Sequence, residues 1–402
     1  YEDVHDMVNK YHDTTFYLIC SNIKDFKFIN EIFGMEKGNQ VLIKQAKLMA
    51  SNPSERTICA RLMNDRFALC LPREEFDEKR VADSVKELQC EFTGNSFHLH
   101  MYMGVYEIRD RDEAVSIMVD KANIAADTIK NNYDCCVAYY DEHLLEISIE
   151  QRRLLGEFEP ALQNDEFVMY LQPQVKRDGA AKGAEALVRW VHPSRGILTP
   201  YAFIDILENA GLIYKLDLYI WEKAAQKLAE WKEKGYGSYH ISVNISTKDF
   251  YIIDIYETFT GLINKYGIAA SNLHLEITET TLMTDFEKNM NIIHKLQGVG
   301  FRVEIDDFGS GYSSLNMLKD ISADVLKIDM GFLRKSENEV KGQDILESII
   351  TLAGKIGMDV ITEGVETKKQ LDMLTMMGCH EFQGYYFSKP VPVSEFEEKY
   401  LV

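Results

Sequence analysis

The sequence predicts an α/β protein with two parts, a compact mixed domain followed by a (β/α)8 barrel. The chain has 402 residues, enough for two or three domains, and 46% of them are hydrophobic, an ordinary value for a globular protein with substantial cores. In the second half, strand-like segments alternate with segments of helical periodicity, which is the pattern of a barrel with helical crossovers. Polar side chains recur near the ends of those strands, where a barrel gathers its catalytic loops.

The first half has a mixed pattern of strands and helices. Segments rich in β-branched and aromatic residues predict strands at 14–23, 58–63, 67–72, 97–108 and 135–141. Apolar residues three and four positions apart predict helices at 38–50, 73–89 and 112–130. A further helical pattern at 141–162 leads into the second half without a Gly/Ser-rich linker, so we expect a fairly stiff connection. The expected division is therefore 1–142, a connecting helix at 143–160, and 161–402.

The second half has eight predicted strands. They fall at 166–172, 183–190, 239–246, 273–278, 301–307, 324–329, 359–364 and 381–387. Each strand carries one polar residue within or near its second half, and these residues are Gln172, Glu185, Asn244, Glu276, Asp306, Lys327, Glu363 and Gln383. Solvated acids placed at random would not recur at the same point of every strand, so we expect a ring of functional side chains on one face of the barrel.

This ring predicts a site for two hard cations. Its ligands are carboxylate and amide oxygens without histidine or cysteine, a set that selects Mg²⁺ or Mn²⁺ over zinc. Two metals bridged by a shared aspartate suit phosphodiester hydrolysis. Lys327 could orient the attacking water, and Arg189 could hold a phosphate. Taken singly, Lys327 could instead be an interior ion-pair partner, and Asn244 could bond only backbone.

Two adjacent aspartates, Asp306 and Asp307, stand where a strand is expected to end. Neighbouring carboxylates repel, so a buried pair needs a proton, a cation or solvent. The segment also contains Gly309, Ser310 and Gly311, and on its own it is equally consistent with a solvated turn. Its place in the ring favours metal binding.

Composition excludes other classes of function. The formal net charge of −20 argues against nonspecific binding to duplex DNA, and an anionic small substrate would need local positive charge, most simply a metal ion. Seven cysteines without a CxxC spacing indicate reduced thiols in a cytosol, rather than a disulfide framework or a zinc site. No apolar run of about 18 residues is present. The first residue is Tyr rather than Met, so we expect an upstream segment.

The second half resembles the EAL domain family, bacterial phosphodiesterases that open cyclic di-GMP to linear pGpG. The resemblance covers roughly Ile149 to Val402. Its motifs occur in fixed order as LQP (171–173), EALVRW (185–190), SVNIS (242–246), LEITET (275–280), DDFGSGYSSL (306–315), LKID (326–329), TEGVE (362–366) and FQGYYFSKP (382–390). The family fold is a modified barrel whose first strand can run antiparallel.

The resemblance implies a role for each site residue. Metal-binding positions fall on Glu185, Asn244, Glu276, Asp306 and Asp307, with Glu363 and Gln383 also in the metal site. Lys327 matches the lysine beside the attacking water, and Glu363 matches a glutamate assigned to metal binding or base catalysis. Expected substrate contacts are Gln172, Leu187, Arg189, Lys327 and Gln383. Glu279 matches a glutamate that steadies the Asp-Asp-Phe-Gly loop, which couples the site to a dimer partner in the family.

The first half resembles a GGDEF domain, the cyclase that makes cyclic di-GMP, with an altered signature. In RLMNDRF (61–67), Met63 and Asn64 replace two glycines and Arg66 replaces an acid, leaving Asp65. Side chains at the two glycine positions obstruct the approach of a nucleotide to the backbone. Asn22 replaces the first metal-binding aspartate, which removes charge needed to hold Mg²⁺.

Other positions of this half are also informative. Asp127 occupies the place of a phosphate-binding lysine, and Ser54 and Thr57 stand where an inhibitory RxxD would be. Lys27 and Asn30 persist, and Asn30 matches a guanine-contacting residue. We therefore expect no cyclase activity and no product inhibition at that site.

Three hypotheses remain open. The protein is an active cyclic di-GMP phosphodiesterase whose first half is regulatory or structural, or it is a receptor that binds the dinucleotide without cutting it. In a third, the first half binds GTP and tunes the barrel, against the simpler alternative of a packing scaffold. The family also implies a homodimer through the EAL domain. It further implies cytoplasmic domains, which an upstream segment could anchor to a membrane.

Overall fold

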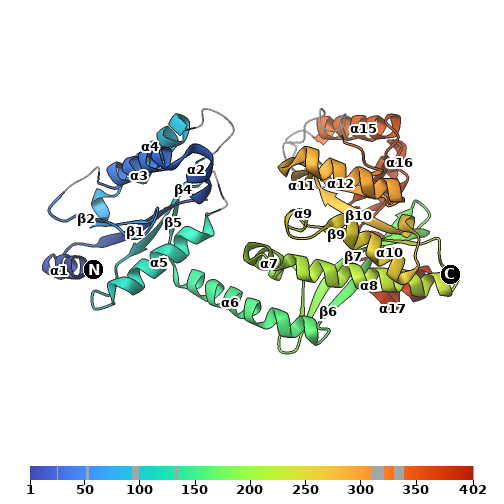
Figure 1. The fold of residues 1–402 in the computed structure, drawn as a ribbon, viewed down its shortest axis with the longest axis horizontal. Helices are drawn as coiled ribbons and strands as arrows, with labels where there is room; N and C mark the ends of the chain where they lie inside the picture. Colours follow the sequence, from blue (N-terminus) through green and yellow to red (C-terminus); the bar gives the residue numbers. More distant parts are fainter. Residues whose placement is uncertain are drawn as a thin grey trace. The chain divides into compact units, whose positions relative to one another are not determined.

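The computed structural model describes residues 1–24, 26–50, 54–92, 99–130, 132, 135–308, 321–329 and 339–401. The chain divides into two compact units, Tyr1–Arg153 and Leu154–Val402, each with its own sheet (Figure 1). The division falls within helix α6 (Glu142–Gln163). Among the described helices, none is both long enough and apolar enough to cross a membrane.

The first unit is a five-stranded sheet with helices on both faces. Its strands are β1 (Phe16–Ile23), β2 (Ile58–Arg61), β3 (Phe67–Pro72), β4 (Met101–Glu107) and β5 (Val137–Tyr139), in the order β2-β3-β1-β4-β5. All neighbouring strands are antiparallel except the parallel pair β4–β5. Its helices before α6 are α1 (Glu2–Lys10), α2 (Phe26–Phe33), α3 (Met35–Met49), the 3-10 turn η1 (Arg73–Glu75), α4 (Glu78–Phe92) and α5 (Val115–Thr128).

The central strand β1 is apolar along nearly its whole length because both of its faces are covered. Tyr17 and Ile19 pack with α2, α3 and α4, whereas Leu18 and Cys20 pack with α1 and α5. Period-2 alternation therefore sends successive side chains into two different cores. On β4, a Cβ at Gly104 would lie 1.8 Å from a backbone oxygen of α5, so only glycine permits this close approach.

The second unit is a closed barrel of eight strands within its described residues. They are β6 (Phe167–Lys176), β7 (Ala181–His192), β9 (His240–Ile245), β10 (Leu273–Thr278), β11 (Val303–Phe308), β12 (Val325–Asp329), β13 (Asp359–Glu363) and β14 (Glu381–Phe382). Neighbouring strands from β7 through β9 to β14 are parallel, and β6 closes the barrel by pairing antiparallel with both β7 and β14. The predicted fold class is confirmed, including the antiparallel first strand implied by the resemblance.

Helices and short strands surround the barrel (Figure 1). The helical elements are η2 (Pro200–Ala202), α7 (Ile204–Ala210), α8 (Ile213–Glu233), α9 (Asp249–Ile252), α10 (Ile255–Tyr266), η3 (Ala270–Asn272), α11 (Glu279–Thr284), α12 (Phe286–Val299), α15 (Glu339–Lys355), α16 (Lys368–Met376) and α17 (Val393–Tyr400). The short strands β8 (Gly196–Leu198) and β15 (Val391–Pro392) pair with β7 and β6. One continuous apolar core fills the space between the strands and the helices.

Several predicted strand bounds of the barrel were wrong, and the first strand, for example, continues from residue 172 to Lys176. The last strand ends at Phe382 rather than at residue 387, because Gly384 turns the chain close to Val365. A Cβ on Gly384 would lie 2.3 Å from the Val365 carbonyl oxygen. The second strand runs past residue 190 to His192, because its far end forms a hairpin with β8.

Candidate functional site

The centre of the candidate site is a buried lysine on β12. Lys327 is 0% exposed, and its Nζ lies 2.7 Å from Glu363 Oε1 and 2.9 Å from Glu276 Oε1. The same atom lies 3.3 Å from Asp306 Oδ1 and 3.4 Å from Glu185 Oε2. Five strand positions far apart in the sequence therefore meet at one point inside the barrel. One ammonium cannot neutralise four carboxylates at once.

The electrostatics of the carboxylates reflect this excess of negative charge. Burial, reinforced by Glu185, raises the pKa of Glu276 well above its usual value. Burial likewise raises the pKa of Asp306, and it raises that of Glu363 to about 8, although Lys327 opposes both shifts. The pKa of Lys327 is held well above its usual range despite burial, because the surrounding acids favour the ammonium.

Two acceptor atoms in the site lack donors. Glu276 Oε2 and Gln383 Oε1 are buried and accept no hydrogen bond from any residue that the structure describes. Buried acceptors in folded proteins are normally satisfied, so such atoms indicate a missing ligand. Since the acceptors are oxygens amid excess negative charge, the residues present fit hard divalent cations.

Amide side chains connect the remaining predicted residues. Asn244 Nδ2 donates to Glu185 Oε1 at 3.2 Å, and Gln383 Nε2 donates to Glu185 Oε2. Gln383 Nε2 also lies 3.3 Å from Gln172 Oε1, while Gln172 Nε2 donates to the Ser388 carbonyl. The structure thus brings Gln172, Asn244 and Gln383 around Glu185.

The aspartate pair lies at an irregularity of β11. The pairing of β11 with β12 shifts register between Ile305 and Phe308, and Asp307 has a left-handed backbone with φ of 56°. A regular strand would send the two carboxylates to opposite faces. Burial, followed by the charge of Asp306, raises the pKa of Asp307, which also interacts with Lys327 and Glu185. The bulge therefore keeps both acids near the site.

Strand-end position was right for most residues but failed for Glu185, and it does not apply to Gln172, because β6 runs antiparallel and its second half lies at the opposite end of the barrel. Asn244, Glu276 and Asp306 lie in the second halves of their strands, and Glu363 is the last residue of β13. Glu185 lies in the first half of β7, because the hairpin with β8 extends that strand beyond the barrel. It still reaches the site, where it is paired in register with Gln172.

Of the two expected substrate contacts on β7, Leu187 borders a cavity. Leu187 and Asn244 line a cavity of about 260 Å³ together with Ser246 and Thr278. Arg189 is half-buried, and its guanidinium lies over the ring of Tyr170, 5.4 Å from the ring centre. Burial lowers the pKa of Arg189. This stacking holds the side chain in a defined direction.

Sequence reasoning missed a polar group in the same cavity. Asp217 of α8 lines it, and burial together with the neighbouring Asp249 raises the pKa of Asp217 well above its usual value. The signal was a single acid between apolar residues in KLDLYIW (215–221). Glu279 is the first residue of α11, but the loop that it is expected to steady, including Gly309 and Gly311, lies outside the described residues.

In the first unit, the residues at the expected metal site and signature of the GGDEF domain contact other protein groups or solvent. Asn22 Nδ2 donates to Tyr102 Oη at 3.0 Å, and Asp65 Oδ2 accepts from the Ile23 backbone at 3.1 Å. Asn64 takes a left-handed backbone with φ of 53°, and the Met63 side chain is exposed. Protein groups therefore already bond to Asn22 and Asp65.

The other predicted residues of the first unit lie on α2, α5 and a turn. Lys27 is exposed, and its Nζ lies 3.5 Å from Glu31 Oε1. Asn30 packs closely against Gly38, since a Cβ on Gly38 would lie 1.9 Å from Asn30 Oδ1. Burial raises the pKa of Asp127. Ser54 and Thr57 both donate to Glu75.

Family models match both units. An EAL domain model matches residues 156–390, and a diguanylate cyclase GGDEF domain model matches residues 3–134. The bifunctional diguanylate cyclase/cyclic di-GMP phosphodiesterase MucR of Pseudomonas aeruginosa is 30% identical over 95% of this chain and 57% of its own length. The cyclic di-GMP phosphodiesterase NbdA of the same organism is 28% identical over 94% and 49%. The chain thus spans about half the length of these curated relatives.

A solved structure agrees with the family assignment of the second unit. The complex of PaMucR phosphodiesterase with c-di-GMP is 33% identical with a TM-score of 0.58, and the match covers 61% of this chain and 99% of that one. The family model of the barrel alone matches more than half of the sequence. The chain belongs to the EAL domain family, and its EAL domain follows a GGDEF domain in tandem.

Proposed function

We propose that the second unit is a metal-dependent phosphodiesterase that hydrolyses cyclic di-GMP to linear pGpG. The observation that carries this proposal is the convergence of Glu185, Glu276, Asp306 and Glu363 on one buried lysine. Relatives named as cyclic di-GMP phosphodiesterases and a c-di-GMP complex of a similar barrel support the choice of substrate.

The donor set fits two Mg²⁺ or Mn²⁺ ions. Glu185, Asn244, Glu276, Asp306 and Asp307 would hold them, with Glu363 and Gln383 at the edge of the set. When bound, such ions supply an activated water and neutralise the charge that develops on the phosphate.

The chain's own residues then have distinct tasks. Lys327, fixed by four carboxylates, directs its ammonium at the attacking water or the developing oxyanion. Burial raises the pKa of Glu363 to about 8, so Glu363 would act as a base only once bound cations lower that pKa. Arg189, stacked on Tyr170, presents its guanidinium to a phosphate oxygen pair. Leu187 and the cavity beside it give the nucleotide an apolar wall.

The first unit has a structural or regulatory role and no cyclase activity in this proposal. Asn22 Oδ1 and Asp65 Oδ2 both accept from the Ile23 backbone N–H, at 3.0 and 3.1 Å, and the neutral amide of Asn22 lacks the charge that would hold Mg²⁺. We assign residues 1–142 to this domain, 143–160 to the connecting helix, and 161–402 to the phosphodiesterase, which we expect to dimerise. GTP binding at Lys27 and Asn30 is the weaker alternative to a scaffold.

The test is incubation of the purified chain with cyclic di-GMP and Mn²⁺ or Mg²⁺, with and without chelator. We expect pGpG to form and the chelator to abolish its formation. The alternative is a receptor, which would bind the intact dinucleotide tightly without cutting it. Calorimetry with cyclic di-GMP in the same buffers separates these outcomes, because a receptor gives heat of binding but no product.

A further inference from the structure

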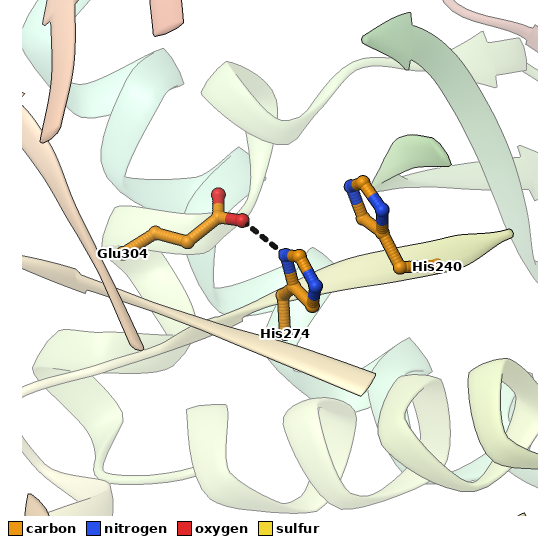
Figure 2. A group of neighbouring side chains, drawn as sticks. All are labelled: His240, His274 and Glu304. Atoms are coloured by element: carbon orange, nitrogen blue, oxygen red, sulfur yellow. Dashed lines mark hydrogen bonds and ion pairs between the residues drawn. The ribbon is translucent and has the colours of Figure 1, made fainter. Parts of the chain in front are cut away.

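A second polar layer lies inside the barrel, deeper than the candidate site. Figure 2 shows three of its members, His240, His274 and Glu304, which are 9%, 4% and 0% exposed. Ser242 and Gln174 complete the layer and are equally buried. The proposed phosphodiesterase mechanism uses none of these five residues.

This layer is built around one carboxylate oxygen. Glu304 Oε1 accepts from His274 Nδ1 at 2.6 Å and from Ser242 Oγ at 3.2 Å. Next to it, His240 Nε2 donates to Gln174 Oε1 at 2.7 Å. Gly183 gives the His240 ring its space, since a Cβ there would lie 2.4 Å from the ring.

The geometry of the two histidines disfavours a metal centre. Their rings are 3.8 Å apart and only 3° from parallel. The lone pairs of an imidazole lie in the ring plane, so those of two parallel stacked rings run side by side and do not converge on one ion. His274 Nδ1 and His240 Nε2 are also already engaged by Glu304 and Gln174.

The sequence positions of this layer point to a different role. Ser242, His274 and Glu304 lie on the adjacent strands β9, β10 and β11, so one carboxylate connects three strands. Two residues later, on the same face of each strand, stand Asn244, Glu276 and Asp306. In the strand register Glu304 lies beside Glu276, and Ser242 lies beside His274, so the bonds of Glu304 join the strand positions two residues before the three candidate ligands.

We propose that Glu304 is a positioning residue that sets the spacing of Asn244, Glu276 and Asp306 through its bonds to Ser242 and His274. This inference rests on the proposed function. Hydrogen bonds behind the ligands of a metal site typically alter metal affinity by about 10- to 100-fold when they are removed. The effect should therefore appear in the metal requirement rather than only in stability.

Two variants at one position test the proposal. Glu304→Gln retains an oxygen that can accept from both donors but removes the charge, whereas Glu304→Leu removes the acceptor. We expect Glu304→Leu to raise the Mn²⁺ concentration for half-maximal hydrolysis by about 10- to 100-fold, and Glu304→Gln to stay within about 3-fold of the unmodified protein. Calorimetric titration of metal-free protein with Mn²⁺ should give the same ranking without relying on turnover.

Val303→Ala is the matched control for lost stability, because Val303 is a buried neighbour on β11 in the apolar core outside the layer. Equal Mn²⁺ requirements for Glu304→Leu and Val303→Ala would overturn the proposal. Equal defects in Glu304→Gln and Glu304→Leu would also overturn it, since charge would then be the cause. If Glu304→Leu does not fold, Ser242→Ala should raise the requirement by about 3- to 10-fold, and no rise would count against the proposal. Absence of any metal dependence in the unmodified protein would instead refute the proposed function.

Discussion

The polar residues at the two expected metal sites differ in how fully other protein groups satisfy them. In the barrel, four carboxylates crowd one lysine, and Glu276 Oε2 is left without a donor among the described residues. In the first unit, the corresponding candidates, Asn22 and Asp65, are bonded to protein groups. Unsatisfied buried acceptors are costly unless a ligand completes them. This difference supports the proposal that the barrel, rather than the first unit, binds catalytic cations.

The largest expected effect is the loss of hydrolysis when an expected metal ligand of the barrel is replaced by alanine. The same replacement in the first unit is the control. Glu185→Ala should lower hydrolysis of cyclic di-GMP by about 10³-fold or more, because metal charge stabilisation is worth several kcal/mol. The matched variant Asn22→Ala should leave hydrolysis unchanged. Product chromatography and circular dichroism check both variants. Substantial turnover by folded Glu185→Ala would remove Glu185 from the metal site.

Lys327→Met should lower turnover by about 10²- to 10³-fold with a smaller change in substrate affinity. The reason is that the ammonium acts where charge develops, while the nucleotide is held elsewhere. The variant also leaves four carboxylates without their cation, so the metal-free protein should lose about 3–5 kcal/mol of stability. Steady-state kinetics that showed equal losses in kcat and affinity would indicate a binding role instead.

The acidic cluster of the metal-free barrel should contribute less stability as pH rises. Burial raises the folded pKa of Glu363 to about 8 and also raises those of Glu276 and Asp306. A carboxyl with a raised folded pKa contributes stability that is complete below its unfolded pKa, about 4.3, and is lost as pH rises through the folded value. Divalent cations replace these protons, so Mn²⁺ should raise the Tm more at about pH 8 than at about pH 5. Thermal denaturation at both pH values measures this difference, and an equal Mn²⁺ effect would contradict the site electrostatics.

The smallest effect is expected at the altered signature of the first unit. Asn64 has a left-handed backbone, which asparagine tolerates and glycine adopts freely. Asn64→Gly should therefore change stability by less than about 1 kcal/mol and should not produce cyclase activity, since the neutral Asn22 still lacks the charge needed to hold Mg²⁺. Denaturant unfolding and a GTP conversion assay provide the measurements. Cyclic di-GMP formed by this single variant would contradict the account of the first unit.

The sequence was sufficient to predict the barrel and its ring because periodicity and strand-end position are local signals. Glu276 and Glu363 follow directly from that reasoning. The β-bulge that keeps Asp307 beside Asp306 depends on pairing with β12, and strand alternation alone predicts the opposite face for Asp307. The stacking of Arg189 on Tyr170 likewise depends on cross-strand neighbours that no single segment reveals.

The deeper layer was also missed, for a different reason. Ser242, His274 and Glu304 each stand two residues before a predicted ligand, so the pattern was visible in the sequence. Their hydrogen bonds to one another required the lateral order of β9, β10 and β11. Local patterns identify which face a residue occupies, and tertiary packing decides what it meets there.

The most direct test of the contrast between the units is to assay one protein preparation with two substrates in separate reactions. Purified protein with Mn²⁺ is incubated with cyclic di-GMP in one reaction and with GTP in another, and the products are separated by chromatography. We predict pGpG from the first reaction, abolished by chelator, and no cyclic di-GMP from the second. Intact cyclic di-GMP in the first reaction, or new cyclic di-GMP in the second, would contradict the account.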